Sequence, residues 1–301
     1  MSVFVLGAAK ESRWLLKEVK ESGDILFKYV WKFFTIFVVF LALKTWKDTN
    51  HVKINRVAFK TNKFQSNQYL RILQLSDMHN KRAWNLHERL LHKINNLSPD
   101  LIVLTGDLID RRTKRFKKIF SFLDQLISMN IPIYFVTGNH EWGNGKRKKF
   151  MNELRKRNIT ILGNESTRIQ AASIQLTLVG VHDTSTHHED MEKAFQHINE
   201  TRYTILLSHS PYVIKTYPNL PADLVLSGHT HGGQVRLPFI GAVISPGGGV
   251  FPELDKGTFE WERNKYIYVD SGLGTSMIPV RFLNQSQISL IEINGDNQAN
   301  A

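Results

Sequence analysis

Five short stretches of the chain place Asp, Asn or His directly after an apolar run of the length and composition of a buried strand. In open α/β sheets, functional side chains gather at the carboxyl ends of the strands. We therefore expect these polar residues to meet along one sheet edge, which restricts the fold to arrangements that bring five strand ends together. The stretches are Leu75–His79, Gly106–Asp110, Gly138–Glu141, Ser208–Ser210 and Gly228–Gly233.

The side chains in these stretches have the chemistry of metal ligands. They offer imidazole nitrogens, carboxylates and an amide, and the chain contains no cysteine that would add a thiolate. Such donors suit divalent Mn, Zn or Fe, and there are too many of them for one ion. The sequence therefore predicts a hydrolytic site that holds two divalent metal ions, whose identity the ligands do not decide.

Chain length, composition and charge indicate the class of protein and its possible partners. The 301 residues are 42% hydrophobic and 22% charged, which is typical of a globular protein with one main domain. A formal charge of +12 invites a nucleic-acid or anionic-membrane partner. However, basic runs such as Lys114–Lys118 and Lys146–Lys149 are typical of solvated helix faces, and we find no nucleic-acid-binding motif. We expect no specific nucleic-acid partner.

The N-terminal region contains Phe33–Leu43, eleven residues without a charge. A spanning helix needs about 20 apolar residues, with Lys tolerated near its ends, so Lys28 and Lys32 fit an anchor over roughly residues 28–43. Ala42-Leu43-Lys44 is a poor cleavage site, which favours an uncleaved anchor over a signal peptide. An amphipathic helix packed on the domain or lying on a membrane is the alternative.

We expect three regions: 1–48 with the anchor, 49–68 as a connector with a lead-in strand at Val52–Phe59, and 69–301 as the main domain. Residues 13–32 carry five Lys or Arg and residues 44–63 carry six, so charge alone does not decide the orientation.

The main domain alternates between strand and helix patterns. After them, from Val235 to Ile293, the chain is richer in Gly and Pro and has only short strand candidates. This order indicates an α/β fold of layered sheets with helices outside. Strands are predicted at 70–75, 101–105, 133–136, 174–181, 203–207, 224–226, 266–269 and 287–293, and helices at 85–96, 115–128, 145–156 and 190–199.

Taken in order, the five stretches resemble those of the calcineurin-like metallophosphoesterases. The matching residues span 72–234, and five weak motifs in the right order are specific. Gly272–Ser276 and Pro279–Phe282 resemble the membrane-associated bacterial, phosphodiesterase-like branch, although Asn284–Gln287 replaces its usual Pro-Glu pair. The resemblance implies a four-layer α-β-β-α sandwich with an N-terminal anchor helix. From the same resemblance we expect a bacterial cytoplasmic membrane, with the main domain on its extracytoplasmic side.

The resemblance also implies a role for each residue. One metal would be held by Asp77, His79 and His231, the other by Asn139, His209 and His229, and Asp107 would bridge both. A carboxylate shared by two cations is favourable because both stabilise one negative charge, and a bridging hydroxide would then attack phosphorus in line. His140 matches the catalytic histidine, which Asp110 would orient.

Other polar residues are weaker candidates. Arg111 is either a phosphate contact or a solvated loop residue. His182 and Asp183 follow a predicted strand and are candidates to line the cleft, whereas His187 and His188 are more typical of an exposed loop.

We therefore predict a dimetal phosphoric ester hydrolase, a phosphodiesterase or pyrophosphatase acting on lipid- or nucleotide-linked phosphate esters near a membrane. Two alternatives are a protein or small-molecule phosphomonoesterase and a catalytically silent metal-binding scaffold. The full set of polar residues disfavours the scaffold. The oligomeric state is not predicted.

Overall fold

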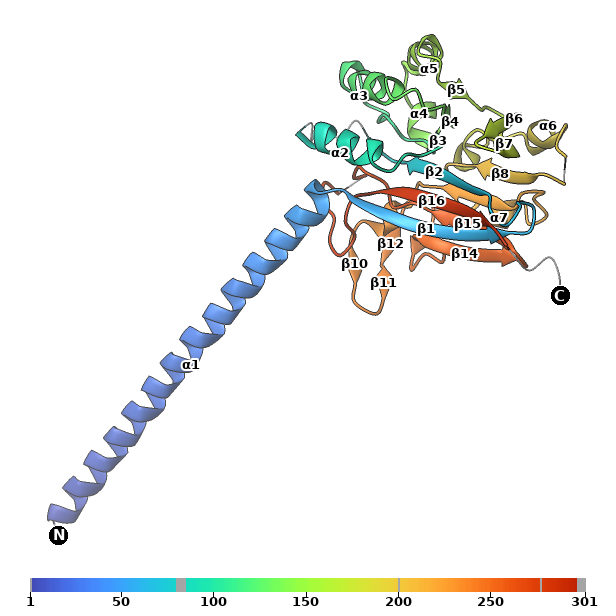
Figure 1. Cartoon of the computed structure of the whole chain (residues 1–301). Helices are drawn as coiled ribbons and strands as arrows, with labels where there is room; N and C mark the ends of the chain where they lie inside the picture. Colours follow the sequence, from blue (N-terminus) through green and yellow to red (C-terminus); the bar gives the residue numbers. More distant parts are fainter. Residues whose placement is uncertain (1, 80–84, 200, 277, 297–301) are drawn as a thin grey trace. The chain divides into compact units, whose positions relative to one another are not determined.

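The structure, a computed structural model, describes residues 2–79, 85–199, 201–276 and 278–296 (Figure 1). The chain divides after Trp46 into two units, which we describe separately. The first unit consists of most of helix α1 (Ser2–Asn50).

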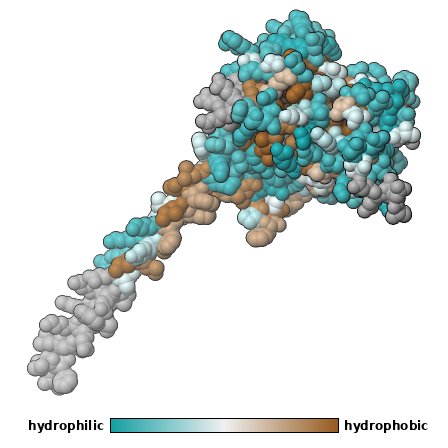
Figure 2. Space-filling view, in the orientation of Figure 1, coloured by the Kyte–Doolittle hydropathy of each residue, from teal (hydrophilic) through white to brown (hydrophobic). Residues whose placement is uncertain are grey.

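Helix α1 contains one segment, Ser22–Asn50, that is long and apolar enough to cross a membrane. The mean hydropathy of its most apolar window is 1.9, and none of that window is buried. Figure 2 shows brown, apolar side chains over much of the part of this helix that is not grey. The segment includes the predicted anchor at residues 28–43 and suggests a membrane anchor.

The second unit contains two six-stranded sheets. The first has the order β1-β16-β2-β3-β4-β5 and the second β14-β15-β9-β8-β7-β6. In the first sheet β2 to β5 are parallel, and in the second β7, β8, β9 and β15 are parallel. The strands of the first sheet are β1 Lys53–Thr61, β2 Tyr69–Leu75, β3 Leu101–Leu104, β4 Ile133–Phe135, β5 Thr160–Ile161 and β16 Gln287–Gly295. Those of the second are β6 Glu165–Ala171, β7 Ile174–Gly180, β8 Tyr203–Leu207, β9 Leu224–Ser227, β14 Gly257–Glu262 and β15 Lys265–Val269.

Helices and short hairpins connect these strands. Because parallel neighbours need a crossover, helices return the chain along the outer faces of the sheets. Two small hairpins, β10–β11 and β12–β13, follow β9. The helices are α2 Asn85–Asn95, α3 Lys117–Ile127, α4 Asn139–Trp142, α5 Arg147–Lys156, α6 Met191–Phe195 and α7 Val213–Thr216, with 3₁₀ turns η1 Thr184–Thr186 and η2 His231–Gly233. The hairpin strands are β10 Arg236–Leu237, β11 Gly241–Ala242, β12 Ile244–Ser245 and β13 Gly249–Val250.

Three apolar cores define the layers. Alternate residues of β2 divide between two of them: Leu70 and Ile72 pack between the sheets, whereas Leu73 and Leu75 pack against α2, α3 and α5. The third core lies between the second sheet and helices α6 and α7, where Val213 and Ile214 are buried. The order helix, sheet, sheet, helix confirms the predicted four-layer sandwich.

The strand after α1 is built into the first sheet. β1 pairs in parallel with β16 from Lys53 to Thr61, and only His51 and Val52 separate it from α1. The last turn of α1 belongs to the second unit, since Ser286 N–H donates to the carbonyl oxygen of Asp48 at 2.8 Å. The lead-in strand predicted at residues 52–59 is therefore an edge strand of the domain.

The sequence patterns missed several strands. β6 and β14 are edge strands whose side chains are mostly partly or fully exposed, so they lack the apolar run that marked the inner strands. The predicted helix at 190–199 is shorter, because α6 ends at Phe195.

Candidate metal centre

The five polar stretches follow the parallel strands β2, β3, β4, β8 and β9. The first three strands belong to one sheet and the last two to the other, and all five deliver their polar residues from their carboxyl ends. The structure therefore places the centre where the two sheets face each other at one end of the sandwich, as expected for parallel strands.

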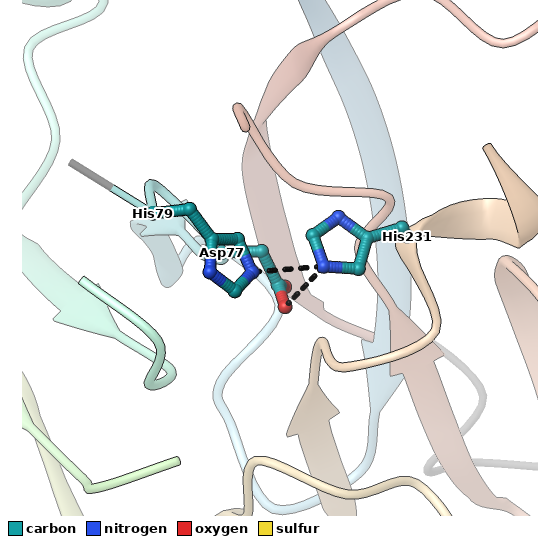
Figure 3. Close-up of side chains that lie close together, drawn as sticks. All are labelled: Asp77, His79 and His231. Carbon is teal, nitrogen blue, oxygen red and sulfur yellow. Dashed lines mark hydrogen bonds and ion pairs between the residues drawn. The ribbon is translucent and has the colours of Figure 1, made fainter. Parts of the chain in front are cut away.

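Asp77, His79 and His231 form the first cluster (Figure 3). The Nε2 atoms of His79 and His231 are 2.9 Å apart, and His231 Nε2 is 3.5 Å from Asp77 Oδ1. All three side chains are buried. The three ligand atoms thus converge on one point, although two come from the loop after β2 and one from η2.

His209, His229 and Asp107 form the second cluster. His229 Nδ1 lies 3.1 Å from His209 Nε2, which lies 3.3 Å from Asp107 Oδ2. The Asn139 amide faces the same point: one of its terminal atoms lies 3.1 Å from His229 Nδ1 and 3.3 Å from both His209 Nε2 and Asp107 Oδ2. These neighbours would accept hydrogen bonds from an amide NH₂, but a cation among them favours the carbonyl oxygen.

Asp107 lies between the two clusters. Its Oδ2 is 3.3 Å from His209 Nε2 and 3.7 Å from His79 Nε2, one imidazole from each cluster. Its Oδ1 accepts the backbone N–H of His140 at 2.8 Å, which fixes the carboxylate plane. Burial acts to raise the pKa of Asp107, but the nearby imidazoles of His209 and His79 lower it below its usual range. The carboxylate is therefore ionised.

Hydrogen bonding and burial prepare three of the imidazoles for metal binding in different ways. The His209 Nδ1 atom is 2.8 Å from the Thr105 carbonyl oxygen and donates to it, which leaves Nε2 as the ligand atom. Burial lowers the pKa of His229 to about 4 and lowers that of His231 well below its usual range, so both imidazoles are neutral. A set of converging lone pairs with one shared carboxylate fits two divalent cations.

The backbone at the candidate ligands has left-handed geometry. Asp77, His79, Asp107, His229 and His231 have φ values of 51°, 49°, 53°, 73° and 51°. Few residues other than glycine adopt such angles, and each costs of order 1–3 kcal/mol. Five of the seven candidate ligands thus share this rare backbone conformation, which indicates that their side chains are held for function.

Comparison with known proteins agrees with this geometry. The family model of the calcineurin-like phosphoesterases matches residues 70–233, more than half of the chain. The chain belongs to this family. The uncharacterized metallophosphoesterases YkoQ and YkuE of Bacillus subtilis (strain 168) are 28% and 30% identical to it, covering 86% and 75% of this chain and 96% and 80% of their own lengths. The bovine transmembrane protein with metallophosphoesterase domain is 30% identical over 73% of this chain and 52% of its own length.

Membership of the phosphoesterase family confirms the predicted enzyme class and the use of two divalent metal ions, for which the clusters supply Asp and His donors. The structure brings together all seven residues predicted as ligands. Their individual assignment to the two ions stays a prediction.

His140 and Asp110 lie beside Asp107. His140 Nε2 is 4.0 Å from Asp107 Oδ2, and its Nδ1 is 3.4 Å from Asp110 Oδ1. Asp110 Oδ1 is closer to His79 Nδ1, at 2.8 Å, so the carboxylate orients a candidate ligand as well as the predicted catalytic histidine. Burial acts to raise the pKa of Asp110, but hydrogen bonding to His140 and His79 lowers it to about 2.

The sequence analysis missed the role of Glu141 in this phosphoesterase centre. Its carboxylate is fully buried and accepts backbone N–H groups from Asp107 at 2.8 Å, Gly138 at 2.9 Å and Ile109 at 3.1 Å. It therefore ties the loop after β3 to the loop after β4. Burial and the charge of Asp107 raise the pKa of Glu141 to about 8. Its place beside His140 in the motif was the available signal.

Arg281 is a second missed residue. Its guanidinium is completely buried and donates from Nε to the carbonyl oxygen of Gly274 at 2.8 Å and from Nη2 to that of Ser271 at 2.5 Å. Its Nη2 also lies 3.4 Å from Nδ1 of His231. Arg281 therefore holds the loop after β15 against a candidate ligand.

His182 and Asp183 follow β7 at the same end of the sandwich. His182 Nδ1 is 2.9 Å from Thr137 Oγ1, just before the stretch that contains Asn139. Asp183 is fully buried. Burial acts to lower the pKa of His209, but the charges of Asp107, Asp77 and, least of the three, Asp183 raise it well above its usual value. His188 is exposed but stacks on Trp142, with ring centroids 3.4 Å apart. These residues add polar side chains next to the two clusters at this end of the sandwich.

Proposed function

We propose that the protein hydrolyses phosphoric diesters or anhydrides at the two-metal centre. The observation that carries the proposal is the position of Asp107, whose Oδ2 lies within 3.7 Å of imidazoles from both clusters. One ion would be held by Asp77, His79 and His231, the other by Asn139, His209 and His229, and Asp107 would contact both.

The metal ions, when bound, supply Lewis-acid stabilisation of phosphoryl oxygens and lower the pKa of coordinated water. The protein's own contribution would be to fix seven ligand side chains through hydrogen bonds from its backbone and from neighbouring side chains. Glu141 and Arg281 supply such contacts and hold two loops that adjoin the candidate ligands.

His140 is the proposed catalytic residue. Its side chain is 21% exposed, whereas those of His79 and His209 are 3% and 0% exposed, so it alone of these three reaches the open side of the centre. With Asp110 at Nδ1, Nε2 is positioned to stabilise charge on the phosphoryl group and to donate a proton to the leaving oxygen.

A metal-dependent activity screen tests this function. The purified full-length chain, stripped and reloaded with Mn, Zn, Fe or Mg, would be assayed on bis-p-nitrophenyl phosphate, p-nitrophenyl phosphate and a nucleotide-sugar diphosphate. We expect turnover of the diester or the anhydride that exceeds turnover of the monoester and is lost on chelation. Preference for the monoester would indicate a phosphomonoesterase, and metal binding without turnover would indicate a scaffold.

We also propose that α1 anchors the enzyme in a bacterial cytoplasmic membrane, with the second unit outside the cytoplasm. The apolar segment Ser22–Asn50 supports an anchor, and the bacterial relatives YkoQ and YkuE support a bacterial membrane; the side on which the second unit lies is set by the following test. Protease added to intact spheroplasts is expected to degrade the second unit, and full protection until lysis would contradict the orientation.

A further inference from the structure

Six large apolar side chains are exposed on the two small hairpins after η2. Figure 2 shows a brown projection at the lower edge of the second unit, at the position that β10 and β11 occupy in Figure 1. Exposed apolar side chains grouped on two successive hairpins are typical of an interaction site. We call these residues the apolar rim: Leu237, Phe239, Ile240, Ile244, Val250 and Phe251.

The hairpins hold the rim outward through local structure. Phe239 and Gly241, on either side of Ile240, have φ values of 66° and 82°, which turn the chain sharply between β10 and β11. At the base, Arg236 pairs with Asp255 and donates to the carbonyl oxygen of Gly232 at 3.1 Å. The turn geometry and the contacts at its base therefore hold the first hairpin in a conformation that exposes the side chains at its tip.

The rim borders the metal centre. β10 begins at Arg236, three residues after η2, which contains the candidate ligand His231. On the second hairpin, Gly247 packs against His229 so closely that a Cβ atom there would lie 2.7 Å from His229 Nε2. The first hairpin thus follows a candidate ligand closely along the chain, and the second hairpin packs against another.

The base of the first hairpin is also joined to the last turn of α1, which belongs to the second unit. The Arg281 N–H donates to Thr49 Oγ1, in the last turn of α1, at 2.8 Å. The exposed residues Ile278 and Val280 precede Arg281, and the Gln234 side chain, just before β10, donates to the carbonyl oxygens of both. One loop thus connects the base of the first hairpin with the end of the candidate membrane helix.

We propose that the apolar rim inserts into the surface of the bilayer that holds α1, and that it presents lipid-borne phosphate esters to the metal centre. The proposal rests on the proposed phosphoesterase function and specifies its substrate class. A lipid keeps its chains among the apolar side chains while its phosphate reaches the polar strand ends beside them. Continuity of the rim with the end of α1 favours the bilayer over a second protein as its occupant.

Site-directed labelling tests the surface without relying on activity. The chain has no cysteine, so Phe239→Cys in the full-length protein gives one site for a nitroxide spin label. Ser121→Cys, on the exposed face of α3, is the matched control. Each protein would be reconstituted at low density in phosphatidylcholine–phosphatidylglycerol bilayers, and label accessibility to oxygen and to a water-soluble nickel chelate would be measured.

We expect the label at position 239 to be accessible to oxygen and shielded from nickel, as for a bilayer-inserted site, and the label at 121 to show the reverse. Equal nickel accessibility at the two positions would overturn the proposal. Shielding at 239 that disappears when the protein is diluted further in lipid would also overturn it, because it would indicate a protein partner.

A second measurement addresses the substrate. Phe239→Ser combined with Ile240→Ser leaves every proposed ligand in place and removes apolar contact area. We expect at least about a tenfold loss of turnover on a phosphodiester lipid in vesicles, with unchanged turnover of bis-p-nitrophenyl phosphate. Equal losses on both substrates would contradict the lipid-presenting role. If the unsubstituted protein hydrolyses neither substrate while the label at 239 is shielded, the proposed function fails and the membrane surface stands.

Discussion

The metal centre and the apolar rim are adjacent, yet they are built in opposite ways. The centre consists of polar side chains that are buried and bonded, such as Asp107, which is 1% exposed. The rim consists of apolar side chains that are exposed, such as Phe251, which is 63% exposed. Each places side chains in an environment that usually disfavours them. This difference fits the proposal that the centre binds cations and that the rim meets an apolar surface.

Asp107→Asn is expected to have the largest effect, because the neutral amide removes the negative charge shared by the two clusters. Loss of several kcal/mol of charge stabilisation corresponds to a fall in kcat/KM of about 10³-fold or more. Metal content measured by elemental analysis should fall with activity. Near-normal turnover with two bound ions would show that the two clusters do not depend on a common carboxylate.

His140→Ala separates chemistry from metal binding. We expect two ions to remain bound and kcat to fall by about 10²–10⁴-fold, the usual contribution of a general acid. The rate with a substrate whose leaving group needs no proton should fall less than the rate with a poor leaving group. Loss of one ion in this variant would instead make His140 a ligand.

Glu141→Gln tests whether the polar contacts behind the ligands hold the centre. The new NH₂ group would face backbone N–H donors, and a buried unsatisfied donor costs about 1–3 kcal/mol. We expect a lower Tm and weaker metal binding by about 10–100-fold, as for other groups that support ligands. Glu153→Gln is the matched control: Glu153 carries a carboxylate on an exposed salt-bridged helix face. If the two substitutions changed the Tm and the metal affinity equally, Glu141 would not be needed to position the ligands.

A substitution in the rim should have the smallest effect on the stability of the fold. Phe239→Ser is expected to change the free energy of unfolding by less than about 0.5 kcal/mol, because an exposed side chain loses little packing. Thermal unfolding in detergent would measure this. A large loss of stability would mean that the rim packs against another part of the protein and is not an exposed apolar surface.

The sequence predicted the inner strands and the centre because one physical rule covers both. Buried parallel strands are continuous apolar runs, and functional residues follow their carboxyl ends, so β8 was predicted at its observed bounds of Tyr203–Leu207. Glu141 was not identified as a support, because its partners are backbone N–H groups, which leave no pattern of side chains.

The rim escaped sequence analysis for a different reason. Its strands are two residues long, too short for a period of two to appear, and an apolar residue in a loop has no preferred environment until the fold is known. The edge strand β14 was missed because exposed and partly exposed residues alternate along it. Local patterns therefore predicted the buried strands and the long apolar helix, but not the exposed apolar surface of the short hairpins.

The two-residue connection between α1 and β1 has a consequence for kinetics. If α1 lies in a bilayer and the substrate is lipid-borne, as proposed, His51 and Val52 are too short to act as a flexible tether, and the enzyme meets its substrate by lateral diffusion in two dimensions. The relevant concentration is then the number of substrate molecules per unit area of membrane. Adding inert lipid at constant bulk substrate should slow the reaction, whereas changing the aqueous volume should not.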